Sequence, residues 1–376
     1  MSIANLQLVR EAAFSYTIKT ASLLLAILFV SRIASGETFY LELTYIVGLV
    51  NMAKILDGSL PYLQRINFPR GYMVNTLDEI QFSLVLMFIQ IGIFTILTGD
   101  IFLSASLAIF GKIYAVGKFR FNVGRKSYLL YLQNTIALAV CLLLPNATVY
   151  DPAVLYLLVS IIVLGFCFFV AKGAIAGNVV NTSLSALWDK NVTSNLVTMS
   201  IFFFYAEFAA VFLYGSVSDE DYAVINTATR ACLLIVGGAS ILSTTMWNTG
   251  NQTVSKLDRL MVERFIYLPI ISLGVVVYFW LSTQPTVIIY DNTFDLAMVC
   301  ALVVISIASA GNLFIADLLA RMELSFNLMF LGFFELISLL LILLFYQDVE
   351  KYFLFWMMLV VTKYILGNTL VRRKVV

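Results

Sequence analysis

The sequence predicts an all-α integral membrane protein with about twelve transmembrane helices arranged in two six-helix lobes. Three observations lead to this fold class. Of 376 residues, 61% are hydrophobic and 12% are charged, whereas soluble domains carry about 25% charged residues. Apolar stretches about 20 residues long recur along the whole chain, as membrane-spanning helices require. Lys and Arg gather in every second connection between these stretches, which is the pattern of a multi-pass protein.

The individual spans follow from the apolar stretches and from the Gly, Pro or charged residues that separate them. The least secure division is at Thr98-Gly99-Asp100, where a turn separates two stretches that would otherwise form one long helix. The expected spans are 14–34, 39–57, 79–99, 101–117, 127–145, 152–172, 194–214, 223–247, 264–282, 296–319, 325–346 and 352–368.

The distribution of Lys and Arg predicts that both the N-terminus and the C-terminus are cytoplasmic. One set of connections carries nearly all the basic residues of the loops, and the cluster between Lys112 and Lys126 is the densest. The opposite set, at 35–38, 99–100, 145–152, 216–222, 282–295 and 347–351, contains one basic residue, Lys351. A missed or an invented helix would invert this alternation, so the alternation also supports the number of spans.

The longest connection on the basic side is rich in Asn, Ser and Thr and lies midway along the chain. We therefore expect an N-terminal six-helix lobe at 1–172, a cytoplasmic inter-lobe link at 173–193 and a C-terminal six-helix lobe at 194–376.

Composition excludes several classes of function. A net charge of +1 gives no basic surface for nucleic acid. The chain has no His, its four Cys lie in apolar runs without CxxC spacing, and it has no P-loop. We therefore expect no metal, no cofactor, no catalytic residue and no enzymatic activity.

Three segments carry a resemblance to a known family. They are R-I-A-S-G-E-T-F-Y at 32–40, L-D-G-S-L-P-Y-L-Q-R at 56–65 and D-E-D-Y-A-V-I-N at 219–226. Together with the two six-helix halves, they resemble the MOP (multidrug/oligosaccharidyl-lipid/polysaccharide) exporter superfamily, and specifically its Wzx-type flippases of lipid-linked oligosaccharides. The resemblance implies alternating access, with the first, second, seventh and eighth helices facing a central cavity.

The resemblance further implies a transporter that moves an undecaprenyl-pyrophosphate-linked oligosaccharide across the bacterial inner membrane for O-antigen or other polysaccharide synthesis. Its implied partners are the lipid-linked substrate, membrane lipids, and a polysaccharide polymerase with chain-length machinery. Two alternatives stay open. One is an ion-coupled, MATE-like exporter of small molecules, and the other is a membrane enzyme such as an oligosaccharide polymerase or an O-acyltransferase. Short outward loops and the absence of His weigh against such an enzyme.

Charged residues within the expected spans are the candidate functional residues, because a charge at the bilayer centre costs about 2.5–3.5 kcal/mol unless it has a partner or faces water. Glu207 and Arg230 lie at similar depth on neighbouring helices and form either a structural ion pair or a substrate contact. Lys19 and Arg32 either extend to the membrane surface or form a basic path for a pyrophosphate. Asn226 joins the candidate cavity residues through the third segment.

The remaining candidates lie outside this group. Lys54 and Asp57, at the cytoplasmic end of the second span, are expected at the membrane interface, with Asp57 as a coupling or structural carboxylate. Glu335 lies near the middle of the eleventh span, within reach of Lys363 on the twelfth. This pair is either structural or contains a carboxylate that couples transport to a proton or another cation.

Overall fold

The computed structural model describes residues 3–34, 38–56, 72–74, 76–123, 126, 128–144, 149–170, 180–187, 193, 197, 207–248, 286–289, 292–321, 325–344 and 348–375. The regular secondary structure of these residues is helical apart from four short strands in the connections. The helices are α1 (Ile3–Ala34), α2 (Thr38–Leu56), α4 (Thr76–Thr98), α5 (Ile101–Val123), α6 (Tyr128–Leu143), α7 (Pro152–Val170), α8 (Leu184–Leu187), α10 (Phe208–Val211), α11 (Asp219–Asn248), α14 (Leu296–Arg321), α15 (Ser325–Leu344) and α16 (Val349–Val375).

The strands form two small sheets. β1 (Tyr72–Val74) pairs in parallel with β2 (Val180–Thr182), with Met73 opposite Asn181. β3 (Thr286–Ile289) pairs antiparallel with β4 (Asn292–Asp295). The period of the apolar residues did not predict these strands, because each is only three or four residues long.

Ten of the expected spans coincide with a long helix of the described part of the chain. Four helices there are long and apolar enough to cross a membrane on length and composition: Leu77–Thr98, Ile101–Lys118, Pro152–Val170 and Val349–Val371. Most of the span expected at 194–214 and all of that at 264–282 lie outside the described residues. The total of twelve helices and the cytoplasmic position of both termini therefore stay predictions.

The chain divides into two compact units, which are described separately. The N-terminal unit comprises Met1–Leu25 and Thr38–Val211. The C-terminal unit comprises Ala26–Glu37 and Phe212–Val376. Since α1 runs from Ile3 to Ala34, its first part belongs to one unit and its last part to the other. The lobe boundaries expected at 172 and 194 stay a prediction.

Acidic residues in the connections that are poor in Lys and Arg serve as N-caps of the helices that follow. The Asp100 carboxylate accepts hydrogen bonds from the backbone N–H groups of Phe102 (2.7 Å) and Leu103 (3.2 Å) at the start of α5. Gly99 before it has a φ of 71°, a left-handed conformation that favours glycine. The turn predicted at this position is confirmed. Asp151, Asp295 and Asp348 cap α7, α14 and α16 in the same way.

In the N-terminal unit, α2 is largely buried and packs against α5, α7 and α10. Gly48 permits the close approach to α10, because a Cβ at this position would lie 2.8 Å from Val211 Cγ2 and 2.9 Å from Ala210 Cβ. By contrast, α4 presents large apolar side chains outward, including Val85 and Phe88. Such an exposed apolar face is suited to lipid.

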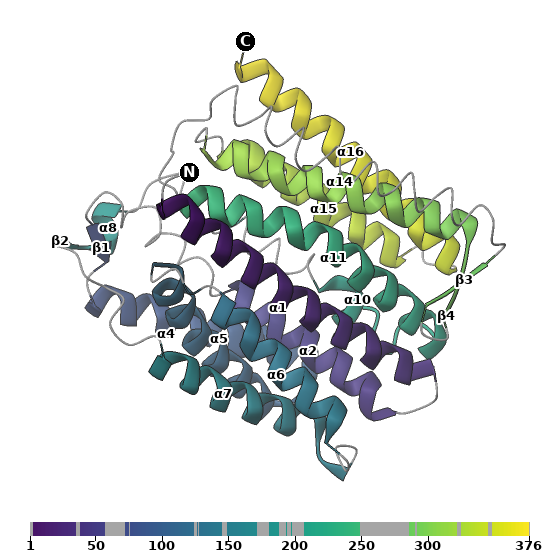
Figure 1. Cartoon of the computed structure of the whole chain (residues 1–376), viewed down its shortest axis with the longest axis horizontal. Helices are drawn as coiled ribbons and strands as arrows, with labels where there is room; N and C mark the ends of the chain where they lie inside the picture. Colours follow the sequence, from purple (N-terminus) through teal and green to yellow (C-terminus); the bar gives the residue numbers. More distant parts are fainter. Residues whose placement is uncertain are drawn as a thin grey trace. The chain divides into compact units, whose positions relative to one another are not determined.

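In the C-terminal unit, α14 lies alongside α11 and α16, and α15 packs against α16 (Figure 1). The Asn312 side chain on α14 donates a hydrogen bond of 3.0 Å to the Val360 carbonyl oxygen on α16. Gly367 on α16 allows a second close approach, since a Cβ there would lie 2.7 Å from Ile315 Cγ2. Small residues and interhelical hydrogen bonds are the usual means of joining helices in a bilayer.

Candidate functional site: a buried polar cluster in the N-terminal unit

The most connected polar site of the described residues surrounds Lys54 on α2. Although the sequence places Lys54 at the membrane interface, its side chain is only 9% exposed. Its Nζ lies 3.4 Å from Asn51 Oδ1 on the same helix and 3.5 Å from Asn134 Oδ1 on α6. Side chains of α5 and α6 cover this end of α2, so protein surrounds Lys54, and its position at the membrane interface stays a prediction.

Aromatic rings of α5 complete the surroundings of the Lys54 ammonium group. Nζ lies 5.2 Å from the centre of the Tyr114 ring and 5.6 Å from that of Phe110. Ring faces attract cations, and the attraction grows when water is excluded. The ammonium group is therefore held by two amide oxygens and two ring faces.

The polar contacts extend from Lys54 through the two asparagines. Asn134 donates to the Ser22 hydroxyl on α1 and accepts from the Tyr156 hydroxyl on α7. Asn51 donates a 3.0 Å hydrogen bond to Glu207 Oε1, directly before α10. We call Ser22, Asn51, Lys54, Asn134, Tyr156 and Glu207 the Lys54 cluster. It links α1, α2, α6 and α7 to the chain at Glu207.

Lys19, one of the residues predicted for the cavity, lies next to this cluster. Its Nζ is 5.7 Å from the centre of the Tyr131 ring on α6. A second contact joins the same two helices, because the Thr135 hydroxyl on α6 donates to the Ile18 carbonyl oxygen on α1 at 3.1 Å. Lys19 lies near the middle of α1, since that helix begins at Ile3, well before the expected span.

The other predicted site residues lie elsewhere. Glu207 is buried in the N-terminal unit, whereas Asn226 and Arg230 are buried on α11 of the C-terminal unit, so the Glu207–Arg230 pair stays a prediction. Arg32 lies on α1, but its side chain is outside the described part of the structure, as is all of Asp57.

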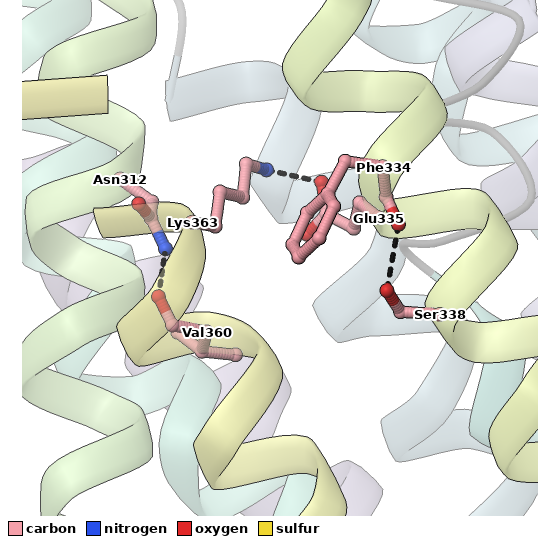
Figure 2. Close-up of polar contacts among 6 residues, drawn as sticks. All are labelled: Asn312, Phe334, Glu335, Ser338, Val360 and Lys363. Carbon is pink, nitrogen blue, oxygen red and sulfur yellow. Dashed lines mark hydrogen bonds and ion pairs between the residues drawn. The ribbon is translucent and has the colours of Figure 1, made fainter. Parts of the chain in front are cut away.

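Glu335 on α15 is buried and forms an ion pair with Lys363 on α16 (Figure 2). The contact expected from the sequence is therefore present. Its role, structural or coupling, stays a prediction.

Sequence reasoning did not select Ser22, Asn51, Asn134 or Tyr156. Two signals were available. Asn51 and Lys54 are three residues apart on one helix and therefore share a face. Asn134 lies inside an apolar run, where an amide needs a partner because the bilayer supplies none. Which helices supply those partners is a property of the packing.

Comparison with solved structures reveals the fold. A crystal structure of MATE in the straight conformation matches with a TM-score of 0.59 and 13% identity, over 98% of this chain and 96% of that chain. A crystal structure of MATE in complex with MaL6 matches with a TM-score of 0.57 and 14% identity over the same shares. The outward-facing conformation of a multidrug resistance MATE family transporter of the MOP superfamily matches with a TM-score of 0.56 and 13% identity, again over 98% and 96%.

These similarities show that the chain has the fold of the MATE transporters, which belong to the MOP superfamily. The fold and the apolar helices together indicate a multi-pass membrane protein. No protein-family profile matches the sequence, and no match was found among curated proteins.

Proposed function

We propose that the chain is a membrane exporter that works by alternating access, with the Lys54 cluster on the path of the transported molecule. The observation that supports this proposal most is that Lys54, only 9% exposed, lies among apolar helices of a MATE fold. A charge inside a membrane protein is costly and is by default functional. The cluster supplies hydroxyl, amide, ammonium and carboxylate groups, a set suited to a polar substrate.

The charges of this site favour a substrate with anionic groups as a second, finer candidate. Lys54 and the neighbouring Lys19 supply two ammonium groups, whereas Glu207 supplies one carboxylate in the cluster. Such an excess of base suits a phosphate or pyrophosphate. On this basis we propose a lipid-linked oligosaccharide as the substrate, moved across the bacterial inner membrane. A small cationic molecule is the alternative that the fold similarity supports directly.

Two transport assays separate these substrate classes. The first measures ethidium accumulation in cells that lack their own drug exporters. The second measures surface polysaccharide in a strain that lacks its own lipid-linked oligosaccharide flippase. Each compares the wild type with Lys54→Met at matched membrane levels. Ser106→Ala on α5 is the control, because Ser106 is exposed and its hydroxyl bonds only the Phe102 carbonyl oxygen of its own helix within the part of the chain that the structure describes.

We expect restored surface polysaccharide with the wild type and with Ser106→Ala, and a loss of at least tenfold with Lys54→Met. Lower ethidium accumulation without restored polysaccharide would favour the small-molecule exporter. Full activity of Lys54→Met in the assay that responds would remove the Lys54 cluster from the transport path. Inactivity of the wild type in both assays would contradict export of either substrate class.

A further inference from the structure

The Glu335–Lys363 ion pair lies near the middle of two helices. Glu335 is 3% exposed and lies near the centre of α15, while Lys363 lies near the centre of α16. A buried ion pair contributes little net stability, because taking two charges out of water offsets most of their attraction. Stability alone therefore does not explain why two charges stand here.

A second acceptor for the lysine lies on α14. Asn312 Nδ2 donates to the Val360 carbonyl oxygen, and Val360 is one helical turn before Lys363 on α16. Asn312 Oδ1 is buried and has no hydrogen-bond partner among the residues that the structure describes. Figure 2 shows the Lys363 stem beginning beside the Asn312–Val360 hydrogen bond, with its amine turned away from Asn312 toward Glu335.

An unpartnered buried carbonyl oxygen loses its hydration without compensation, and this favours any conformation in which a donor reaches it. The ammonium group of Lys363 is the charged donor on the adjacent turn of α16. The four-carbon stem of a lysine is flexible, so the ammonium group can change position by rotation about its single bonds. The ammonium group contacts the Glu335 carboxylate, and Asn312 Oδ1 is a buried oxygen beside the preceding turn of α16 that lacks a donor among the described residues.

We propose that Glu335, Lys363 and Asn312 form a proton-operated latch between α15 and α16. A proton from the aqueous phase binds the Glu335 carboxylate, and the ion pair breaks. Lys363 keeps its own proton and turns to Asn312 Oδ1. The three side chains go from a net charge of zero to +1. The contact between α15 and α16 is released, while Asn312 keeps α14 and α16 together.

Few other charges act on this latch. Glu350 and Lys351 lie at the start of α16, about three turns before Lys363. Asp317 and Arg321 lie on α14, but their side chains are outside the described part of the structure. The further titratable or charged groups described on helices that pack with α15 and α16 are Asp219, Glu220, Asp221, Tyr222, Arg230 and Cys232 on α11, Cys300 on α14, and Tyr352 and Tyr364 on α16. Lys363 is the cation that contacts Glu335 directly.

Infrared spectroscopy of the purified full chain in lipid nanodiscs tests the proton-binding step. Acidification should produce the carbonyl stretch of a buried carboxylic acid in the wild type, and this band should be missing in Glu335→Gln. Asn312→Leu removes the second acceptor and should lower the midpoint of the titration by about one pH unit, a tenfold change in proton affinity. The matched control is Ser338→Ala, whose hydroxyl, among the described residues, bonds only the Phe334 carbonyl oxygen on α15 (Figure 2). Its midpoint should equal that of the wild type.

Hydrogen–deuterium exchange of α15 tests the release. Glu335→Gln mimics the protonated carboxyl, so its α15 amides should exchange faster than those of the wild type at neutral pH. The difference should vanish below the infrared midpoint, and comparing the variants at equal pH removes the intrinsic pH dependence of exchange.

Three results would overturn the latch. They are the absence of a Glu335-dependent band at every pH at which the chain stays folded, equal exchange of α15 in both proteins at neutral pH, and an unchanged midpoint in Asn312→Leu. None of these measurements requires a transported substrate. Their outcome is therefore separate from that of the transport assays.

Discussion

The close approach at Gly48 makes a sharp prediction, because it lies next to the Lys54 cluster. In Gly48→Ala the new Cβ would lie 2.8 Å from Val211 Cγ2 and 2.9 Å from Ala210 Cβ. Carbon atoms in favourable contact are about 3.5–4.0 Å apart, so α2 and α10 must separate. The same two segments carry Asn51 and Glu207, whose side chains are hydrogen-bonded at 3.0 Å.

The change in the free energy of unfolding of Gly48→Ala has three contributions. Overpacking of a tight contact costs about 1–3 kcal/mol, and replacing a glycine within a helix by alanine returns about 0.5–1 kcal/mol. If the separation also breaks the hydrogen bond to the Glu207 carboxylate, a further loss of about 1.5–3 kcal/mol follows. With the hydrogen bond broken, we therefore expect Gly48→Ala to lower the free energy of unfolding by about 1.5–5.5 kcal/mol.

Thermal unfolding of the purified chain in detergent measures this loss. The control is Gly92→Ala on α4, where a new Cβ would have no heavy atom within 4 Å. Both substitutions gain the same helix propensity, so the difference between their Tm values reports the contact between α2 and α10 alone. We expect a lower Tm for Gly48→Ala and an equal or higher Tm for Gly92→Ala. Equal Tm values for the two variants would refute the close approach and, with it, the geometry of the Asn51–Glu207 hydrogen bond.

Three further predictions concern other contacts. Asn134→Leu should lower the free energy of unfolding by about 3 kcal/mol, because it removes the partner of three side chains; chemical denaturation would measure the loss, and an unchanged midpoint would contradict the network. Gly367→Ala should cost about 1–3 kcal/mol, since its Cβ would lie 2.7 Å from Ile315 Cγ2; a Tm equal to that of the wild type would argue against this packing of α14 and α16. Hydrogen bonds from the backbone N–H and the side chain of Lys351, of which the backbone one has the larger effect, hold the pKa of Asp348 below the ordinary value of 3.8. The contribution of Asp348 to stability is therefore present above pH 3.8 and disappears as the pH falls through the lowered pKa. The Tm of Asp348→Ala should lie below that of the wild type at neutral pH and converge with it in acid, and a constant difference would show that the charge is unimportant.

The apolar pattern was sufficient to place the described long helices, because hydrophobic length is the strongest constraint on a membrane protein. It also located the turn at Gly99 and Asp100 correctly, since glycine and a capping aspartate are local signals. The pairing of Glu335 with Lys363 was within reach of sequence reasoning for a related reason. Consecutive helices joined by a short connection run antiparallel, so residues at equal depth can be matched by counting.

The burial of Lys54 could not be predicted in this way. The short distance of this residue from the end of α2 predicts a position at the membrane interface. Its burial, however, depends on α5 and α6, which are remote in sequence. Counting residues gives depth along one helix and does not reveal which neighbours cover a face. The same limit applies to Asn51 and Asn134, whose partners come from other segments of the N-terminal unit.

The aspartate caps change how the charge of one set of connections should be counted. Asp100, Asp151, Asp295 and Asp348 each accept backbone N–H groups at the start of a helix. A helix N-terminus carries about half a positive elementary charge. Each capped carboxylate therefore presents a weaker negative potential to the water than its formal charge suggests. Any difference in surface potential between the two sets of connections accordingly depends more on the Lys and Arg residues of the basic set than on these acids. An approaching ionic solute would therefore experience each capped aspartate as less than a full negative charge.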